Sequence, residues 1–277
     1  MKLAVLGGRA VLWGDAGYLD VAEASDDRFR LANVFDDWSS FRQWARETKA
    51  PRKPLPAAPS FDAPMPLPRQ VFGIGVNYRS HADEAGIVVP ADPLVFTKFP
   101  TCIAGEAQPL QARVPLDWEV ELVVVIGRTA RNVSRDEAWS HVAGLTIGQD
   151  ISDRTMQFQG SHPQFSLCKS GPGYGPVGPW LVTPDALANR DDLAISCTID
   201  GEALQSSRTS QLIHDVPGLV RYLSTVVTLL PGDVIFTGTP AGVGFSRKPP
   251  RFLQPGETLV SAIEGIGELR TKIVSAS

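Results

Sequence analysis

The sequence is poor in the side chains that build disulfide frameworks and zinc sites. It has three cysteines, Cys102, Cys168 and Cys197, and this odd, widely spaced set argues against disulfides and against a thiolate zinc site. Its four histidines never stand at the i,i+4 spacing of a zinc-binding helix. We therefore expect a reducing compartment, the cytoplasm, and we expect that any bound metal ion is held by carboxylates.

Basic residues and long apolar runs are also scarce. The 26 lysine and arginine residues are outnumbered by 30 aspartate and glutamate residues, so the net charge of −4 argues against a nucleic-acid-binding protein. No apolar run approaches the ~20 residues that cross a bilayer. The N-terminal apolar run is broken by two glycines and is too short for a signal peptide. We expect neither a nucleic-acid partner nor a membrane partner.

Glycine and proline, in contrast, are abundant. With 25 and 23 residues in 277, they predict many turns and a strand-rich α+β chain. Seven prolines between positions 51 and 68 indicate an extended linker. We expect a small N-terminal α+β domain (1–50), a proline-rich linker (51–69) and a larger domain (70–277). Periodicity predicts helices at 36–48, 135–142 and 215–227, and strands at 3–6, 10–13, 71–76, 94–98, 120–126, 145–149, 193–199, 234–237 and 258–263.

An acidic pattern precedes the most apolar strand. Asp117, Glu119 and Glu121 alternate, so on a strand their side chains share one face, and the five apolar residues that follow indicate a strand that enters the core. Carboxylates so close together repel unless a hard cation such as Mg²⁺, Mn²⁺ or Ca²⁺ lies between them. A solvated polar face is the alternative. Asp150, at the end of a later strand, is a candidate third donor, or else a helix cap.

A short helix is expected directly after the strand at 71–76. Ser80 and Asp83 have the spacing of a capping box, and Gly86 is a natural helix stop. The helix would carry His81 and Glu84 on one face. Glu84 would orient the imidazole, and His81 would act as a general base for water. The alternative is a surface His–Glu pair without a catalytic role.

The sequence contains three other short motifs. A G-x-G pattern in the strand at 71–76 is not a dinucleotide fingerprint, because Tyr78 stands where the third glycine is needed. Ser166 and Lys169 form an S-x-x-K, the nucleophile pattern of serine β-lactamases, but its companion motifs are missing. Lys169 is more useful as a cation beside an anionic substrate. A Thr- and Gly-rich loop would let the Thr239 hydroxyl approach a carboxylate, or is simply a tight connection.

In their order, five of these features resemble the fumarylacetoacetate hydrolase family, in particular its acylpyruvase and 2-hydroxyhepta-2,4-diene-1,7-dioate isomerase-like branch. They are GIGVNYRSHADE, DWEVELVVVIG, GLTIGQDISDRTMQ, Lys169 and LLPGDVIFTGTPAGVG. The resemblance implies a mixed β-sheet roll and a homodimer. It assigns a divalent ion, Mg²⁺ or else Mn²⁺ or Ca²⁺, to Glu119, Glu121 and Asp150. It assigns catalysis to His81, Glu84 and Lys169, and substrate binding to Tyr78, Arg154, Gln157 and Thr239.

The resemblance also implies a reaction. It is the metal-dependent hydrolysis of a C–C bond in a β-diketo acid, an acylpyruvate or fumarylpyruvate, through a metal-bound pyruvate enolate. Oxaloacetate decarboxylation and isomerisation of 2-hydroxyhepta-2,4-diene-1,7-dioate are alternatives at the same site. A Ser166–Lys169 amidase and a non-catalytic metal-binding protein are alternatives of other classes. The segment 170–174 departs from the Asp-Thr-Phe-like segment that many members have after the lysine, which leaves the identity of the 2-keto acid substrate open.

Overall fold

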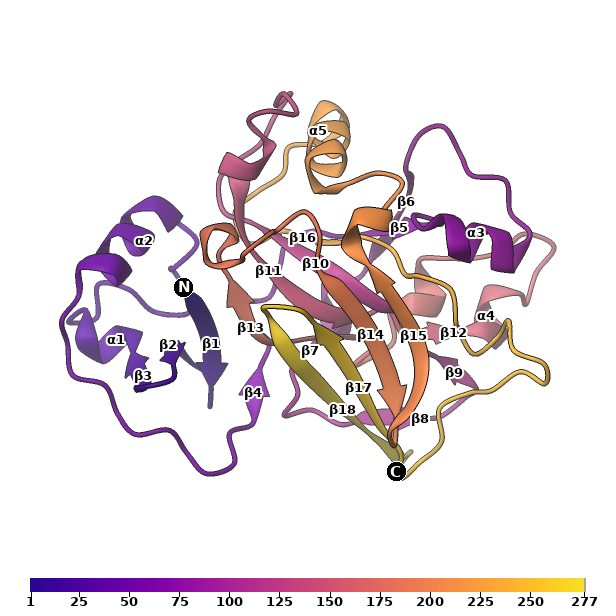
Figure 1. Ribbon diagram of the computed structural model, residues 1–277, viewed down its shortest axis with the longest axis horizontal. Coiled ribbons are helices and arrows are strands. Elements are labelled where there is room, and N and C mark those ends of the chain that lie inside the picture. The colour runs from indigo at the N-terminus through magenta and orange to yellow at the C-terminus, as the bar shows by residue number, and fades with distance from the viewer. Residues whose placement is uncertain (277) are drawn as a thin grey trace.

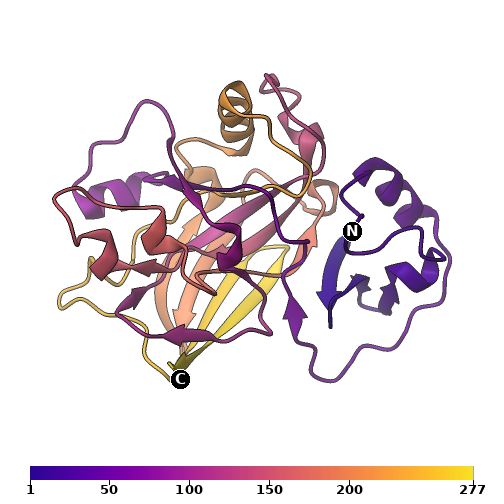
Figure 2. The same cartoon turned by 180° about the vertical axis from the view of Figure 1, so that it is seen from behind.

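The structure is a computed structural model and describes residues 1–276 (Figure 1). Within this range the chain forms three β-sheets and a few short helices, so the α+β class expected from the sequence is confirmed. Seen from behind in Figure 2, the helices lie around the outside of the sheets. Every strand expected from the sequence is present, with small shifts at the ends.

The larger sheet mixes parallel and antiparallel pairs. Its strand β10 lies between β11 and β16, and β16 pairs in parallel with β5. β10 is buried along its whole length, which explains why its sequence is apolar apart from Glu121. The strands of this sheet are β1 (Lys2–Leu6), β2 (Arg9–Gly14), β3 (Gly17–Asp20), β4 (Phe61–Asp62), β5 (Val71–Gly75), β6 (Leu94–Lys98), β7 (Ile103–Ala104), β10 (Val120–Ile126), β11 (Val142–Gln149), β13 (Gly175–Val182) and β16 (Val234–Phe236).

A second sheet packs against β10 and β11 and completes the roll. The core between the two sheets contains Leu122 and Leu145 from the larger sheet and Ile195, Leu259 and Leu269 from the second. The order of the second sheet is β15-β14-β17-β18-β8. Its strands are β8 (Leu110–Ala112), β14 (Ala194–Ile199), β15 (Glu202–Arg208), β17 (Thr258–Ile263) and β18 (Gly267–Ser275), while β9 (Leu116–Asp117) and β12 (Ser152–Asp153) form a separate pair.

Two of the three helices expected from periodicity are confirmed, α2 and α5. Asp37 and Asp215 cap them, each accepting a backbone N–H three residues further on. The helix expected at 135–142 is wrong, because only one 3₁₀ turn forms there before the chain enters β11. No helix within residues 1–276 is long and apolar enough to cross a membrane. The helices are α1 (Val21–Ala24), α2 (Trp38–Glu47), α3 (Arg79–Ala85), α4 (Arg154–Gln157) and α5 (Val216–Val226), with 3₁₀ turns η1 (Pro100–Cys102), η2 (Ala138–His141), η3 (Leu167–Lys169), η4 (Pro184–Ala186) and η5 (Thr209–Gln211).

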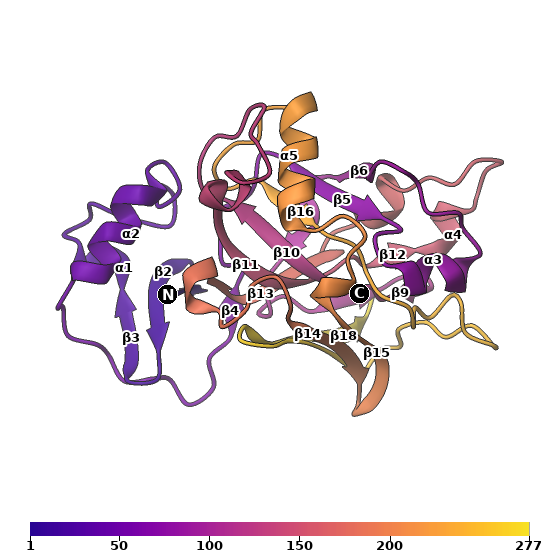
Figure 3. The ribbon, with the colours of Figure 1, turned by 45° about the horizontal axis from the view of Figure 1, so that its top comes forward.

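The N-terminal strands continue the larger sheet. β1 pairs antiparallel with β13, and β4, which lies inside the proline-rich segment, pairs with β1. The expected division into 1–50, 51–69 and 70–277 therefore runs across one continuous sheet. Figure 3 shows the N-terminal elements at one end of the molecule and α3 with α4 at the opposite end. The candidate site described below lies at the end that carries α3 and α4.

Candidate active site

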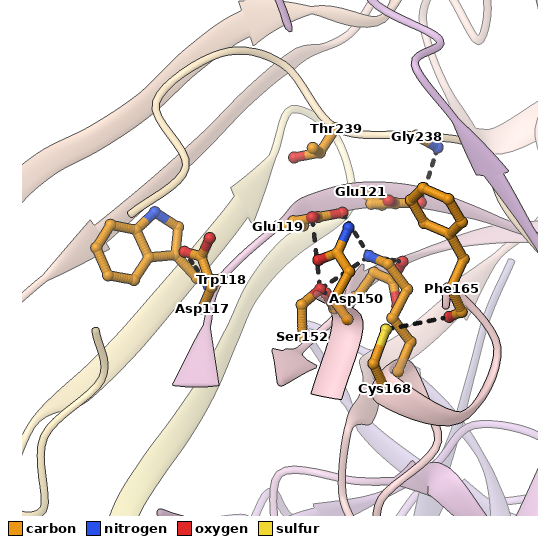
Figure 4. Close-up of polar contacts among 12 residues, drawn as sticks. Asp117, Trp118, Glu119, Glu121, Asp150, Ser152, Phe165, Cys168, Gly238 and Thr239 are labelled. Atoms are coloured by element: carbon orange, nitrogen blue, oxygen red, sulfur yellow. Dashed lines mark hydrogen bonds and ion pairs between the residues drawn. The ribbon is translucent and has the colours of Figure 1, made fainter. Parts of the chain in front are cut away.

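Antiparallel pairing of β10 with β11 brings three acidic side chains together. Glu119 directly precedes β10 and Asp150 directly follows β11, and the backbone N–H of Asp150 donates to the Glu119 carbonyl at 2.9 Å. With Glu121, these residues place one carboxylate oxygen each within 4.8 Å of the others (Figure 4). All three side chains are buried. The alternating pair Glu119 and Glu121 and the candidate third donor Asp150 thus lie side by side, as expected from the sequence.

Two buried lysines contact this carboxylate cluster of Glu119, Glu121 and Asp150. Lys169 Nζ donates to Glu119 Oε2 at 2.9 Å, to Asp150 Oδ2 at 2.7 Å and to Ser152 Oγ at 2.8 Å, so all three ammonium hydrogens are used. Lys98 Nζ donates to the other Asp150 oxygen, Oδ1, at 2.6 Å. Both oxygens of Asp150 are therefore held by cations, and the carboxylate cannot rotate freely.

Asp117 is separated from the carboxylate cluster, against the expectation of a shared strand face. The chain leaves the strand between β9 and β10, and Figure 4 shows Asp117 on the far side of Glu119. Asp117 accepts from Arg154 Nε at 2.8 Å and from the Gly244 backbone N–H at 2.7 Å. Arg154 also donates to Glu119 Oε1 at 2.7 Å and to Gln157 Oε1 at 2.8 Å. Asp117 thus positions Arg154 and lies outside the carboxylate cluster.

Glu119 and Glu121 differ in their protonation behaviour. Burial opposes ionisation of Glu119, but the charges of Lys169 and Arg154 lower its pKa to about 2. Burial, and then the charges of Asp150 and Glu119, raise the pKa of Glu121 well above its ordinary value. Burial disfavours the Lys169 ammonium, yet Asp150 and Glu119 outweigh it and raise its pKa. Lys169 and Arg154 therefore compensate the charge of Glu119, whereas ionised Glu121 is repelled by Asp150 and Glu119.

The repulsion at Glu121 makes the carboxylate cluster suited to a divalent cation. Within residues 1–276, Glu121 has no lysine, arginine or histidine at ion-pair distance, and it accepts only the Gly238 N–H, at 2.7 Å. A cation beside Glu121 relieves the repulsion that raises its pKa. Donor sets made only of oxygen favour Mg²⁺, Mn²⁺ or Ca²⁺ over softer metals. The residues present therefore fit such an ion.

The His–Glu pair lies on α3, as expected. His81 Nδ1 is 3.1 Å from Glu84 Oε2, and Gly86 ends the helix in the left-handed region with φ of 65°. The expected capping box is wrong, because α3 begins at Arg79 and the Ser80 hydroxyl accepts the Ala241 backbone N–H instead. Ser80 thus helps to fasten the helix to the loop that follows β16.

Gly242 makes the second contact between that loop and α3. Its N–H donates to Glu84 Oε1 at 2.9 Å, so one carboxylate oxygen faces the loop and the other faces His81. Gly242 has φ of +108°, and a Cβ there would stand 2.1 Å from the Leu204 carbonyl oxygen. Only glycine fits this position. The Gly-rich loop is therefore needed for geometry, and it also orients the His–Glu pair.

One cavity of about 610 Å³ connects the His–Glu pair with Glu119 of the carboxylate cluster, whereas Glu121 and Asp150 are not part of its wall. Among the residues expected at the site, its walls include His81, Glu84, Glu119, Arg154, Gln157, Lys169 and Thr239. The Thr239 hydroxyl donates to the Val120 carbonyl at 2.9 Å and accepts from Gln205 at 2.8 Å. Tyr78 differs from the expectation, because it is fully buried and is not part of the cavity wall. Burial, and then the charge of Glu121, raise the Tyr78 pKa.

Comparison with known families identifies the fold of this site. The model of the fumarylacetoacetate (FAA) hydrolase C-terminal domain matches residues 70–274. The chain belongs to the fumarylacetoacetate hydrolase family. Members of this family are enzymes, among them hydrolases, isomerases and tautomerases.

Three relatives show the range of this family. The human protein named oxaloacetate tautomerase FAHD2A, mitochondrial, is 40% identical over 228 residues, which cover 79% of this chain and 72% of the relative. A crystal structure described as an HpcE protein from Mycobacterium smegmatis is 48% identical, with complete coverage of both chains and a TM-score of 0.95. A maleylpyruvate hydrolase from Sphingobium sp. SYK-6, in complex with manganese(II) and pyruvate, is 25% identical, with complete coverage of both chains and a TM-score of 0.81.

Sequence reasoning missed Lys98, although a signal was present. Leu94, Phe96 and Lys98 alternate along β6, and Leu94 and Phe96 line the cavity. The ammonium of Lys98 therefore continues an inward-facing row and is buried, with 2% of the residue exposed. A lysine at the end of an apolar strand face was the sign of an internal partner.

The Ser166–Lys169 pair is not arranged as a nucleophile and its base. The Ser166 hydroxyl donates to the Thr97 carbonyl at 2.6 Å, whereas Lys169 Nζ is bound to the carboxylate cluster. A serine nucleophile needs its base within hydrogen-bond reach. The geometry therefore gives no support to the amidase alternative.

Proposed function

We propose that the protein is a divalent-metal-dependent hydrolase that cleaves a C–C bond of a β-diketo acid of the acylpyruvate type. The observation that carries the proposal is an oxygen-only carboxylate cluster whose member Glu119 lines the same cavity as the His81–Glu84 pair. The first suits a hard metal ion, and the second suits the activation of water.

In this proposal Glu119, Glu121 and Asp150 hold Mg²⁺ or Mn²⁺. When bound, the ion supplies a Lewis acid for the carboxylate and keto oxygens of a 2-keto acid. The manganese and pyruvate in the maleylpyruvate hydrolase relative support this assignment. Lys98 and Lys169 hold Asp150 from both sides, and Lys169 and Arg154 hold Glu119. The carboxylates are thus oriented before any ligand enters.

His81 is proposed to take a proton from water. Glu84 contacts Nδ1 of His81, so the ring is held with Nε2 as its free nitrogen. Water attacks the carbonyl carbon that is distal to the carboxylate, and the bond between this carbon and C3 of the pyruvate unit then breaks. The electron pair goes to C3, which takes a proton. The products are pyruvate and the acid of the acyl group.

Oxaloacetate tautomerisation is the second candidate, and the human relative named for that activity favours it. It needs a proton to move between C3 and the enol oxygen, and it needs no water nucleophile. His81 lies in the cavity and can carry such a proton. Decarboxylation of oxaloacetate or isomerisation of an unsaturated 2-oxo diacid would use the same carboxylate cluster.

Product analysis separates these reactions. The purified protein with Mg²⁺ is given acetylpyruvate, a longer acylpyruvate and oxaloacetate, and the carbon products are followed by NMR. Hydrolysis yields pyruvate and the acyl acid in equal amounts. A faster keto–enol exchange of oxaloacetate without any new carbon species would favour the tautomerase. Release of CO₂ without an acid fragment would favour the decarboxylase.

We also propose that the protein forms a homodimer, as the family resemblance implies, and that it acts in the cytoplasm. The three cysteines are free and buried, which suits a reducing environment. Light scattering coupled to size-exclusion chromatography measures the mass in solution. A monomeric mass at micromolar concentration would contradict the homodimer.

A further inference from the structure

The cavity has a polar end and an apolar end. At the polar end, Lys169 Nζ lies 5.3 Å from the ring centre of Phe96, and Arg154 Cζ lies 6.0 Å from that of Phe245. The apolar wall therefore begins directly beside the two cations that hold the carboxylate cluster. Each ring packs against a second phenylalanine of the wall, in the pairs Phe96–Phe165 and Phe158–Phe245.

Much of this apolar wall is exposed to solvent. Phe158 and Phe245 are 46% and 45% exposed, and Ile87 and Leu94, which line the same cavity, are 48% and 41% exposed. Large apolar side chains that cluster on an exposed concave surface are typical of a ligand-binding site. The cavity volume of about 610 Å³ leaves room beyond a pyruvate-sized group.

Among residues 1–276, the wall at the apolar end contains no cation to pair with a second negative charge. The cations in the cavity wall, Arg154 and Lys169, donate to protein carboxylates at the polar end. The other charged wall residues are both acidic, Glu84 beside His81 and Glu119 of the carboxylate cluster. A carboxylate placed against the phenylalanines would lose water without gaining a counter-ion, which is costly.

From this arrangement we infer that the substrate carries an apolar group, aliphatic or aromatic, at the end remote from its 2-keto acid, and that the site disfavours a second carboxylate there. The inference rests on the proposed function, because it takes the carboxylate cluster as the place of the 2-keto acid. It differs from the diacid chemistry in the names of several relatives. A longer apolar group covers more of the exposed wall, and each buried methylene strengthens binding about fourfold.

The test uses two ligands that differ only at the remote end. 2-Oxooctanoate ends in a methyl group, and 2-oxosuberate has the same chain length and ends in a carboxylate. Neither has a β-keto group to cleave, so isothermal titration calorimetry on the Mg²⁺-loaded protein measures binding without turnover. We expect 2-oxooctanoate to bind at least about tenfold more tightly. Equal affinities, or tighter binding of 2-oxosuberate, would overturn the inference.

Two variants place the preference in this cavity. Phe158→Arg adds a cation to the wall at a half-exposed position, and we expect it to strengthen 2-oxosuberate binding about tenfold through a charge-assisted hydrogen bond. Phe99→Arg is the matched control, since Phe99 is 53% exposed and is not part of the cavity wall. An equal gain in both variants would show a general charge effect and would contradict the inference.

Failure of the inference and failure of the proposed function give different results. If acylpyruvates are cleaved while the two ligands bind equally, only the inference fails. If 2-oxooctanoate binds preferentially while no acylpyruvate is cleaved, the apolar preference stands and the hydrolase assignment fails. If neither ligand binds, the 2-keto acid site is contradicted, and the inference fails with it.

Discussion

Lys98 Nζ donates to Asp150 Oδ1 at 2.6 Å in a part of the protein where both side chains are fully shielded from solvent. Lys98 belongs to β6 at one edge of the larger sheet, and Asp150 follows β11 near its middle. This ion pair therefore ties a peripheral strand to the carboxylate cluster. Removing Lys98 would leave Asp150 Oδ1 without its buried donor, with Lys169 as the remaining cation of this carboxylate.

Replacing Lys98 tests this positioning role. Lys98→Met keeps most of the side-chain volume and removes the charge, and we expect a stability loss of about 3–5 kcal/mol in the metal-free protein. Denaturant unfolding in EDTA measures it. Lys53→Met is the control, because Lys53 forms an exposed ion pair with Glu23, and little change is expected there. Equal stability of the Lys98 variant and the parent would contradict the role.

His81 is expected to act in turnover and not in metal binding. His81→Ala should lower kcat about 10²–10⁴-fold, which is the usual contribution of a positioned general base. Its Mg²⁺ affinity, measured by calorimetry, should stay unchanged because the carboxylate cluster is intact. His141→Ala is the control, since His141 contacts the Thr129 carbonyl on a different part of the surface. Loss of Mg²⁺ binding in His81→Ala would contradict the assignment.

Glu121 should make metal binding and stability depend on pH. Its folded-state pKa is raised, so between the unfolded and folded pKa values the native protein binds more protons than the unfolded chain. The metal-free protein should therefore lose stability as pH rises through this range. Mg²⁺ needs the ionised carboxylate, so its affinity should rise over the same range, and its binding should release a proton.

Glu121→Gln isolates that contribution. In EDTA, the Tm of the parent should fall as pH rises, and part of this fall comes from Glu121. The variant should lack that part, so its Tm should fall less over the same pH range. Loss of a residue that only hydrogen-bonds to a metal ligand lowers metal affinity ~10–100-fold. Because Glu121 is proposed as a ligand itself, the Mg²⁺ affinity of the variant should fall by more than this. Identical pH profiles of Tm in parent and variant would be inconsistent with a raised pKa at Glu121.

Ser166 should be dispensable for turnover. Its hydroxyl donates to the Thr97 carbonyl and accepts no contact from Lys169 Nζ, whose three hydrogens bind elsewhere. Ser166→Ala should therefore keep kcat/KM within about twofold, because a surface substitution of this kind disturbs little. A drop of several orders of magnitude would restore the serine nucleophile as a hypothesis.

Part of the carboxylate cluster could be predicted because its signals are local. Glu119 and Glu121 alternate beside an apolar strand, so strand periodicity pairs them, whereas Asp150 is open between a metal donor and a helix cap and joins them through the family resemblance. The His81–Glu84 pair follows from helical spacing, and Gly86 marks the helix end. These patterns need no knowledge of distant contacts.

Other features depend on contacts between distant segments. β13 contains Gly178 and Pro179, which argue against a strand, yet it pairs with β1 and β11 on its two sides. The 3₁₀ turn at 138–141 replaces the expected helix because the following residues pair with β10. The partner of Lys98 lies 52 residues away in the sequence. No local pattern specifies such pairings, and only the folded sheets bring these residues together.

Metal dependence of acylpyruvate cleavage tests the central claim most directly. The protein is stripped with EDTA, and the loss of acylpyruvate absorbance is followed before and after addition of Mg²⁺ or Mn²⁺. We expect no cleavage without the ion and full recovery with it in the parent, and no recovery in Glu121→Gln. Cleavage that is the same with and without metal would contradict a function built on Glu119, Glu121 and Asp150.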